Sequence, residues 1–251
     1  GAVVTGPVEF DSRLVTPGGL FLALPGDHVD GADFAAAAVA AGAVAVLATR
    51  PVGVPSIIVT DGLAALSALA AAVVRRLPDV TVIGITGSSG KTSTKDLLAQ
   101  LLERLGPTVA PPESFNNELG HPYTVLRATT ETRFLVLETS ARGIGHIKHL
   151  TDIAPPRIGV VLNVGSAHLG EFGSRAAIAE AKGELVEALP ADGLAVLNAD
   201  DGAVAAMAAR TVAPVLTFGE APGAGVRATG VELDELGRAR FTLTWPDESV
   251  P

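Results

Sequence analysis

The run Val80-Thr-Val-Ile-Gly-Ile-Thr86 and the segment Gly87-Ser-Ser-Gly-Lys-Thr92 directly after it decide the fold of this chain. An unbroken apolar run of this length is typical of a strand buried on both faces of a sheet. The residues from Lys91 to about Leu105 predict a helix. Glycines between a strand and a helix let backbone N–H groups close around phosphate oxygens, and the helix dipole favours the negative charge. The segment therefore predicts a phosphate-binding loop.

The side chains of this loop indicate a nucleotide with a metal ion. Lys91 would supply a cation to the β- and γ-phosphates, and Thr92 a hydroxyl to Mg²⁺. The pattern departs from the strict form GxxxxGK[ST], because residue 85 is isoleucine. The alternative is a Gly/Ser turn before an ordinary helix. The residues expected to hold the phosphates are Thr86, Gly87, Ser88, Ser89, Gly90, Lys91, Thr92 and Ser93.

Strands and helices alternate after the loop, which predicts an α/β fold with a mostly parallel, helix-covered sheet. The later strands are expected at Phe134–Glu138, Ile158–Asn163, Leu194–Leu197 and Val215–Phe218. Helices are expected near Gly145–Leu150 and over Ser174–Leu189. The tail differs, because Val226–Leu233 and Arg238–Trp245 flank a turn and predict a hairpin.

The residues before the loop predict a separate, small α/β domain. Short strands are expected at Val8–Phe10, Leu20–Leu24, Ala43–Ala48 and Ser56–Thr60, with an Ala-rich helix from about Asp33 to Ala41. A second helix should run from Gly62 to Leu77 with Asp61 as its N-cap. Pro78-Asp79 then marks a linker. We therefore predict an N-terminal domain over residues 1–77 and an ATPase-type central domain over residues 78–251.

Composition excludes several classes of protein. The chain has 251 residues, a formal net charge of −9, 48% hydrophobic residues and no cysteine. The acidic balance argues against nucleic-acid binding, so an anionic ligand needs a local site. Without cysteine there is no disulfide scaffold and no thiolate chemistry. No apolar run reaches the roughly 20 residues of a membrane span.

Two polar side chains follow later strands of the predicted sheet. Glu138 ends one strand, and His168 lies just past Ile158–Asn163. Because the carboxyl ends of parallel strands meet at one edge, both should lie near the phosphate loop. A carboxylate and an imidazole there are reasonable Mg²⁺ ligands, directly or through water. The alternatives are a carboxylate that only accepts hydrogen bonds and a polar loop or core histidine.

Lys182 lies on the apolar stripe of its predicted helix. Ile178, Leu185 and Leu189 share that stripe. A buried ammonium is unfavourable unless it is paired or chemically altered. The alternative is a lysine whose stem packs on the core while its ammonium reaches solvent.

Further motifs complete a family pattern. They are Asp11-Ser12-Arg13, Pro17-Gly-Gly-Leu-Phe21, Asp30-Gly31, Asn116-Asn117-Glu-Leu-Gly120-His-Pro122, Glu138-Thr-Ser-Ala-Arg142-Gly-Ile-Gly145-His-Ile147, Asn163-Val-Gly-Ser-Ala-His168-Leu, Ala181-Lys182-Gly-Glu184 and Leu197-Asn198-Ala-Asp200-Asp201. With the phosphate loop, they resemble the Mur ligase family of bacterial cell-wall synthesis. The motifs nearest the start resemble the uridine-substrate domain of that family. The Asn-Asn and Gly-x-Pro segment favours the members that add D-Ala-D-Ala.

The resemblance implies an ATP-dependent, Mg²⁺-dependent ligase that joins D-Ala-D-Ala to UDP-MurNAc-tripeptide through an acyl phosphate. It implies that Thr92 and Glu138 hold one Mg²⁺, and that His168 and a carbamate on Lys182 serve a second metal or orient the acyl phosphate. Lys91, Lys182 and His168 would be catalytic. Asn198 and Asp200 would lie on the adenosine side. The expected substrate contacts are Ser12, Arg13, Asn116, Asn117, Ser140 and Arg142.

Other functions are also compatible with the sequence. The related ligase that adds the third-position diaminopimelate or lysine, and a nucleotide-binding module without ligase activity, stay open. A small-molecule kinase is disfavoured, because it would not need the uridine-type domain. Family members carry a further C-terminal domain, so we expect a fragment that binds ATP but does not ligate by itself. We expect a cytoplasmic monomer.

Overall fold

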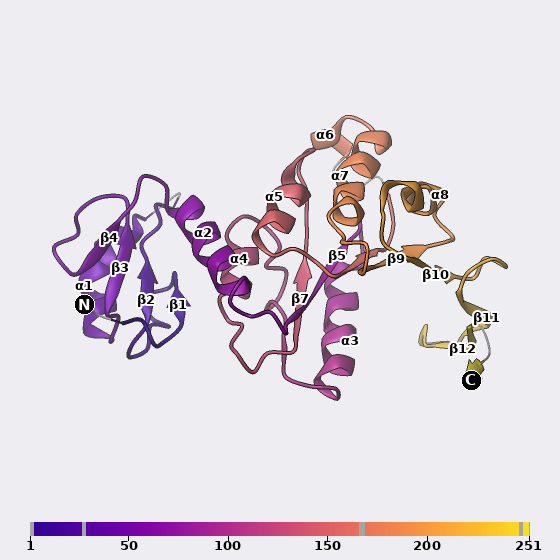
Figure 1. Cartoon of the computed structure of the whole chain (residues 1–251), viewed down its shortest axis with the longest axis horizontal. Coiled ribbons are helices and arrows are strands. Elements are labelled where there is room, and N and C mark those ends of the chain that lie inside the picture. The colour runs from indigo at the N-terminus through magenta and orange to yellow at the C-terminus, as the bar shows by residue number, and fades with distance from the viewer. Residues whose placement is uncertain (1–2, 27–28, 166–168, 246–247, 251) are drawn as a thin grey trace.

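The computed structural model of the chain describes residues 3–26, 29–165, 169–245 and 248–250, which form two β-sheets joined by the second helix (Figure 1). The first sheet has four parallel strands in the order β1-β2-β3-β4. Its elements are β1 (Val8–Glu9), β2 (Leu20–Leu22), η1 (Gly31–Phe34), α1 (Ala35–Ala40), β3 (Ala45–Ala48), β4 (Ser56–Ile58) and α2 (Gly62–Val74). The predicted α/β elements of this part of the chain are therefore present.

Alternation along β2 and β3 gives this small sheet two apolar faces. Phe21 and Val46 pack with α1 on one face, whereas Leu20, Leu22 and Leu47 pack with Leu66 of α2 on the other. Asp61 begins α2, because its carboxylate accepts hydrogen bonds from the N–H groups of residues 63 and 64 at 2.9 and 3.0 Å. The predicted N-cap is thus confirmed.

The second sheet has nine strands in the order β13-β12-β11-β10-β9-β8-β5-β7-β6. Pairing is parallel from β6 to β11 and antiparallel for β11–β12 and β12–β13. The strands are β5 (Thr81–Thr86), β6 (Thr108–Val109), β7 (Phe134–Glu138), β8 (Ile158–Val161), β9 (Leu194–Asn198), β10 (Val215–Gly219), β11 (Val226–Leu233), β12 (Ala239–Trp245) and β13 (Glu248–Val250). The predicted parallel sheet and terminal hairpin are confirmed.

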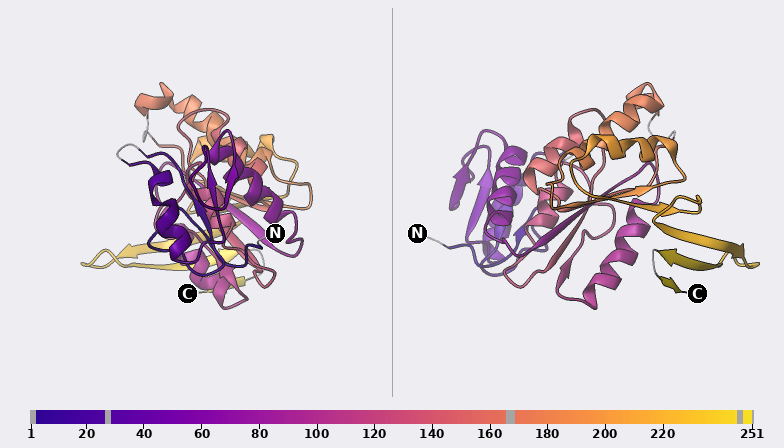
Figure 2. Two further views of the ribbon diagram at one scale, coloured as in Figure 1. Left: turned by 90° about the vertical axis from the view of Figure 1, so that its left-hand side faces the viewer. Right: turned by 45° about the vertical axis from the view of Figure 1, so that its right-hand side comes forward.

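Helices cover both faces of this sheet (Figure 2). On one face α3 packs Leu98 and Leu102 against Ile83 and Ile85 of β5. On the other face α5 and α7 pack against β8 and β9, with Leu185 in the centre of that core. The helices are α3 (Lys91–Glu103), α4 (Gly120–Val125), α5 (His146–Ile153), α6 (Leu169–Phe172), α7 (Arg175–Glu187), α8 (Gly202–Ala205) and η2 (Ala206–Arg210).

The strand order places the loop after β5 at a switch point of the sheet. β7 and β8 flank β5 on opposite sides, so their carboxyl ends surround the start of α3. Ligands of open parallel sheets bind at such points. Within the residues that the structure describes, no helix is both long and apolar enough to cross a membrane.

Candidate functional site

The loop between β5 and α3 has the backbone of an anion site. Gly90 takes φ +81 as the N-cap of α3, and no side chain caps that end. A Cβ at Gly87 would lie 2.9 Å from Leu162 Cβ. Glycine is therefore required at both positions: at Gly90 because of its backbone conformation, and at Gly87 because there is no space for a side chain. The first N–H groups of α3 are left without a side-chain cap, beside a lysine.

Lys91 lies folded over this loop. Its ammonium donates a hydrogen bond to the carbonyl of Gly87 at 2.9 Å. Burial lowers the pKa of Lys91, and the negative charge of Glu138 opposes that shift. Lys91 is thus held at the loop. A bound phosphate would replace the neutral carbonyl as the partner of its ammonium with a charged oxygen, which forms a stronger hydrogen bond.

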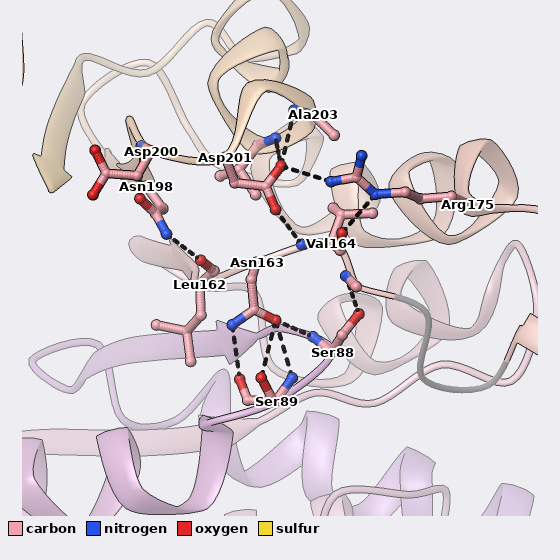
Figure 3. Close-up of polar contacts among 12 residues, drawn as sticks. Ser88, Ser89, Leu162, Asn163, Val164, Arg175, Asn198, Asp200, Asp201 and Ala203 are labelled. Atoms are coloured by element: carbon pink, nitrogen blue, oxygen red, sulfur yellow. Dashed lines mark hydrogen bonds and ion pairs between the residues drawn. The ribbon is translucent and has the colours of Figure 1, made fainter. Parts of the chain in front are cut away.

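Asn163, which follows β8, braces the loop from the other side (Figure 3). Its Oδ1 accepts hydrogen bonds from the N–H groups of Ser88 and Ser89 at 2.9 and 3.0 Å. Its Nδ2 donates to the carbonyl of Ser89 at 3.2 Å. Gly165 N–H also donates to Ser88 Oγ at 2.9 Å. The loop shape therefore depends on residues that lie more than seventy positions further along the chain.

Glu138 ends β7 completely buried beside the first turn of α3. Its Oε2 accepts hydrogen bonds from Thr92 Oγ1 and Asn116 Nδ2, each at 3.3 Å. Its Oε1 is buried and has no hydrogen-bond partner within the described residues. An unsatisfied buried carboxylate oxygen is costly, and a metal ion would satisfy it.

The donor set therefore fits Mg²⁺. This ion prefers oxygen ligands, and several of them are usually supplied by water and by the phosphates of a substrate. Thr92 and Glu138 are the oxygen donors that the described residues bring together. The described residues contain no group of three acidic, histidine or cysteine side chains that could hold a metal unaided. His168, the other predicted ligand, lies outside the residues that the structure describes.

Lys182 is buried in α7, with 6% of its surface exposed. Ile178, Leu185 and Leu189 are buried beside it, so the predicted apolar stripe is confirmed. Burial is the main cause that lowers the pKa of Lys182 to about 8, and the positive charge of Lys91 lowers it further. The two predicted lysines are thus close enough for the charge of Lys91 to act on Lys182.

The predicted substrate residues after β6 and β7 form a hydrogen-bonded network. Ser140 Oγ donates to Asn116 Oδ1 at 2.9 Å, and Asn116 reaches Glu138. Asn117 instead accepts a hydrogen bond from Gly120 N–H at 2.9 Å and helps to begin α4. Arg142 is exposed and lines a small cleft with Asn117 and Ser140.

Asn198 and Asp200 support loops beyond the sheet edge, and Figure 3 shows the contact that Asn198 makes. Asn198 Nδ2 donates to the carbonyl of Leu162 at 2.8 Å. Asp200 accepts hydrogen bonds from the N–H groups of Glu220 and Ala221 at 2.7 and 2.8 Å. Both side chains therefore have partners within the chain, and their predicted role toward adenosine stays a prediction.

Ser12 and Arg13 lie in the first sheet unit, at a cavity of about 640 Å³. Phe10, Phe21 and Leu119 contribute its apolar lining. The guanidinium of Arg13 donates to both carboxylate oxygens of Asp11, and these hydrogen bonds lower the pKa of Asp11 to about 2. Arg13 is largely exposed, so its charge is accessible to a ligand in the cavity.

Two positioning carboxylates lie within the family motifs but have no role predicted from the sequence. Asp201 accepts hydrogen bonds from Val164 N–H at 2.8 Å and from Arg175 Nη2 at 3.3 Å, and it begins α8 (Figure 3). Glu184 of α7 is buried and accepts hydrogen bonds from the N–H groups of Gly145 and Lys148 at the start of α5. Asp201 precedes a glycine and a helix, a local N-cap pattern, but Glu184 caps a distant helix and gives no local signal.

Comparison with known proteins agrees with this geometry. The model of the Mur ligase middle domain matches residues 85–250, and that of the Mur ligase family catalytic domain matches residues 7–88. UDP-N-acetylmuramoyl-tripeptide–D-alanyl-D-alanine ligase of Mycobacterium tuberculosis is 59% identical over 96% of this chain and 52% of its own length. The Escherichia coli protein of the same name is 42% identical over 77% of this chain and 43% of its own length.

A crystal structure of the MurF ligase of Thermotoga maritima in complex with ADP is also similar. It superposes with a TM-score of 0.86 at 34% identity and covers 98% of this chain and 57% of that chain. The present chain spans about half the length of the curated relatives it matches. The resemblance inferred from the motifs is confirmed by these matches: the chain belongs to the Mur ligase family.

Proposed function

We propose that the protein carrying this chain is an ATP-dependent ligase that joins D-Ala-D-Ala to UDP-MurNAc-tripeptide in peptidoglycan precursor synthesis. The observation that carries the proposal is the uncapped start of α3 with Lys91 on the loop and the Thr92–Glu138 pair beside it, where Glu138 keeps a buried oxygen without a partner among the described residues. This arrangement suits a triphosphate rather than a neutral ligand. The names of the matched relatives supply the two substrates.

The phosphates of ATP would lie against the uncapped N-terminus of α3. Lys91 would leave the Gly87 carbonyl and bind the β- and γ-phosphates. Thr92 and Glu138 would hold Mg²⁺, which neutralises charge on the phosphates when bound. Asn198 and Asp200 would face the adenosine side.

The acceptor carboxylate would then attack the γ-phosphorus, so that a carboxyl–phosphate bond forms and ADP leaves. The amine of D-Ala-D-Ala attacks the carbonyl carbon of this acyl phosphate, loses a proton and expels inorganic phosphate. Protein groups contribute mainly positioning and charge neutralisation to such transfers. Lys91 would serve the phosphoryl group, and His168 would assist at the second metal or at the acyl phosphate.

We propose a carbamate on Lys182 as part of this site. The neutral amine attacks CO₂, so that an N–C bond forms and one proton is released. Burial beside Lys91 supports this change, because it disfavours a second ammonium and favours an anionic group. The new oxygens are suitable ligands for Mg²⁺, whereas an ammonium is not.

The UDP part of the acceptor is assigned to a domain over residues 1–77. Ser12 and Arg13 at the cavity of about 640 Å³ would contact the diphosphate. Asn116, Asn117, Ser140 and Arg142 would contact the peptide end. Asn117, Ser140 and Arg142 line one small cleft, and Asn116 joins Ser140 to Glu138 by hydrogen bonds. The central, ATP-binding domain would begin at residue 78.

The full-length protein tests the proposed function directly. Phosphate release should require ATP, UDP-MurNAc-tripeptide and D-Ala-D-Ala together. Lys91→Ala should lower turnover by about 10²–10³, the loss expected for one preorganised charged donor. Lys148→Ala, on the exposed side of α5, is the matched control and should keep activity. Ligation of diaminopimelate or lysine to UDP-MurNAc-dipeptide instead would overturn the assignment.

A further inference from the structure

Three aromatic rings join the two sheet units, and one of them, Phe10, also lines the cavity of the first sheet. Phe10 follows β1, Phe115 lies before α4, and Tyr123 lies in α4. Their ring centroids are 5.0 Å apart for Phe10–Tyr123, 5.8 Å for Phe115–Tyr123 and 6.2 Å for Phe10–Phe115. Tilted and edge-to-face pairs at these separations are favourable beyond the area they bury.

A hydrogen bond anchors the same cluster. Tyr123 Oη donates to Glu9 Oε2 of β1 at 2.8 Å. Burial and this contact raise the pKa of Tyr123 to about 12, so the phenol stays protonated as a donor. The cluster is therefore a fixed contact between β1 and α4.

Phe115 belongs to a segment that also reaches the phosphate site, residues 111–118 between β6 and α4. Buried Lys95 of α3 donates to the carbonyl of Pro111 at 2.9 Å. Ser114 Oγ lies 3.0 Å from Thr92 Oγ1. Asn116 Nδ2 donates to Glu138 Oε2. The two chain neighbours of Phe115 thus contact the two residues proposed to hold Mg²⁺.

The backbone on both sides of Phe115 is constrained by close packing at one point and by an uncommon conformation at another. A Cβ at Gly120 would come within 2.7 Å of Phe115 Cα and Cβ, so the backbone of Phe115 packs directly on the start of α4. Glu113 takes φ +50, a conformation that L side chains rarely adopt. Displacing the ring of Phe115 would therefore shift the residues on both sides of it.

We propose that Phe115 is a positioning residue, whose packing on Phe10 and Tyr123 holds Ser114 and Asn116 against Thr92 and Glu138. The metal-dependent part of nucleotide binding then depends on the contact between the two sheet units, although Phe115 touches no ligand. This proposal rests on the proposed function only for the identity of the nucleotide and the metal.

The test measures Mg²⁺-dependent binding of ADP to the full-length protein by calorimetry, without ligase substrates. Phe115→Ala should raise the Mg²⁺ concentration needed for half-maximal binding by about tenfold, within the range of couplings between contacting residues. Phe115→Leu should give a smaller shift in the same direction. Leu101→Ala is the control, because Leu101 is exposed on α3.

A double-mutant cycle separates positioning from a general loss of stability. If Phe115 acts through Asn116, the double variant Phe115→Ala, Asn116→Ala should need no more Mg²⁺ for half-maximal binding than the more severe of the two single variants. Fully additive effects, or a lower melting temperature with an unchanged Mg²⁺ requirement, would overturn the proposal. Should Phe115→Ala fail to fold, the same cycle with Phe115→Leu decides it. Wild-type protein that bound no Mg²⁺–ADP would refute the proposed function instead.

Discussion

Asn163→Ala is the sharpest perturbation of the phosphate loop that the structure offers. The side chain makes two hydrogen bonds to the N–H groups of Ser88 and Ser89 and one to the carbonyl of Ser89. Each bond contributes about 1 kcal/mol net, so their loss has a ceiling of about 3 kcal/mol. The Ser88 N–H also donates to the main-chain carbonyl of Asn163 at 3.1 Å, which the alanine variant keeps. Because Ser89 is exposed as well, so that water can replace part of its hydrogen bonds, we expect a loss of about 1–2 kcal/mol.

Most of that loss should fall on nucleotide binding. An unbraced loop must be ordered when the phosphate arrives, and that ordering reduces affinity. We therefore expect Asn163→Ala to bind Mg²⁺–ADP about tenfold more weakly in calorimetry, with a small fall in melting temperature.

Asn163→Asp is the matched comparison. It keeps an acceptor for the two N–H groups but sets an oxygen against the carbonyl of Ser89 and adds negative charge beside the phosphates. We expect it to weaken binding more than the alanine variant. Affinities of the alanine variant within twofold of the parent, or tighter binding by the aspartate variant, would refute the bracing argument.

Three further substitutions test the environments of single side chains. Glu184→Ala should destabilise the protein by about 1–3 kcal/mol in thermal unfolding, because it leaves two N–H groups at the start of α5 unpaired. Glu184→Gln should be nearly as destabilising, because a glutamine amide has one acceptor oxygen for these two N–H groups. The pKa of Lys182 is lowered from 10.5 to about 8, so its buried ammonium costs stability below about pH 8, and this cost disappears between pH 8 and 10.5. In buffer free of CO₂, Lys182→Met should thus be more stable than the parent at pH 7 by roughly 1–3 kcal/mol and lose most of that advantage by pH 10. Arg13→Ala should weaken calorimetric binding of UDP-MurNAc-tripeptide and leave ADP binding unchanged; equal losses for both ligands would contradict the assignment of Arg13 to the cavity of the first sheet.

The layout of the fold could be read from the sequence because its signals are local. The apolar runs at β5, β7 and β8 are continuous, as strands covered on both faces require. The caps of α2 and α7, Asp61 and Ser174, accept hydrogen bonds from backbone groups two or three residues away. Element ends differed by a few residues; α2, for example, ends at Val74 rather than Leu77.

The supporting contacts of the site could not be read in the same way. Asn163 meets Ser88 only because β8 pairs with β5 in one particular register. Glu184 meets the start of α5 only because α5 and α7 lie side by side on one face of the sheet. Such pairings depend on tertiary distances, which neither spacing nor propensity encodes. The apolar stripe did identify Lys182 as buried, but not that Lys91 would be its electrostatic neighbour.

Two features of the site lower the stability of the fold, and both involve charged groups. Burial and the positive charge of Lys91 disfavour the protonation of Lys182, while Glu138 keeps one buried oxygen without a partner among the described residues. Each feature alone is unfavourable for stability. As long as Lys182 is unmodified, a bound phosphate would offset the repulsion between the two ammonium groups, and a metal ion would satisfy the carboxylate oxygen of Glu138. Both defects are corrected by the same Mg²⁺–nucleotide complex, so the energetic penalties of the free site become a preference for that ligand over a neutral one.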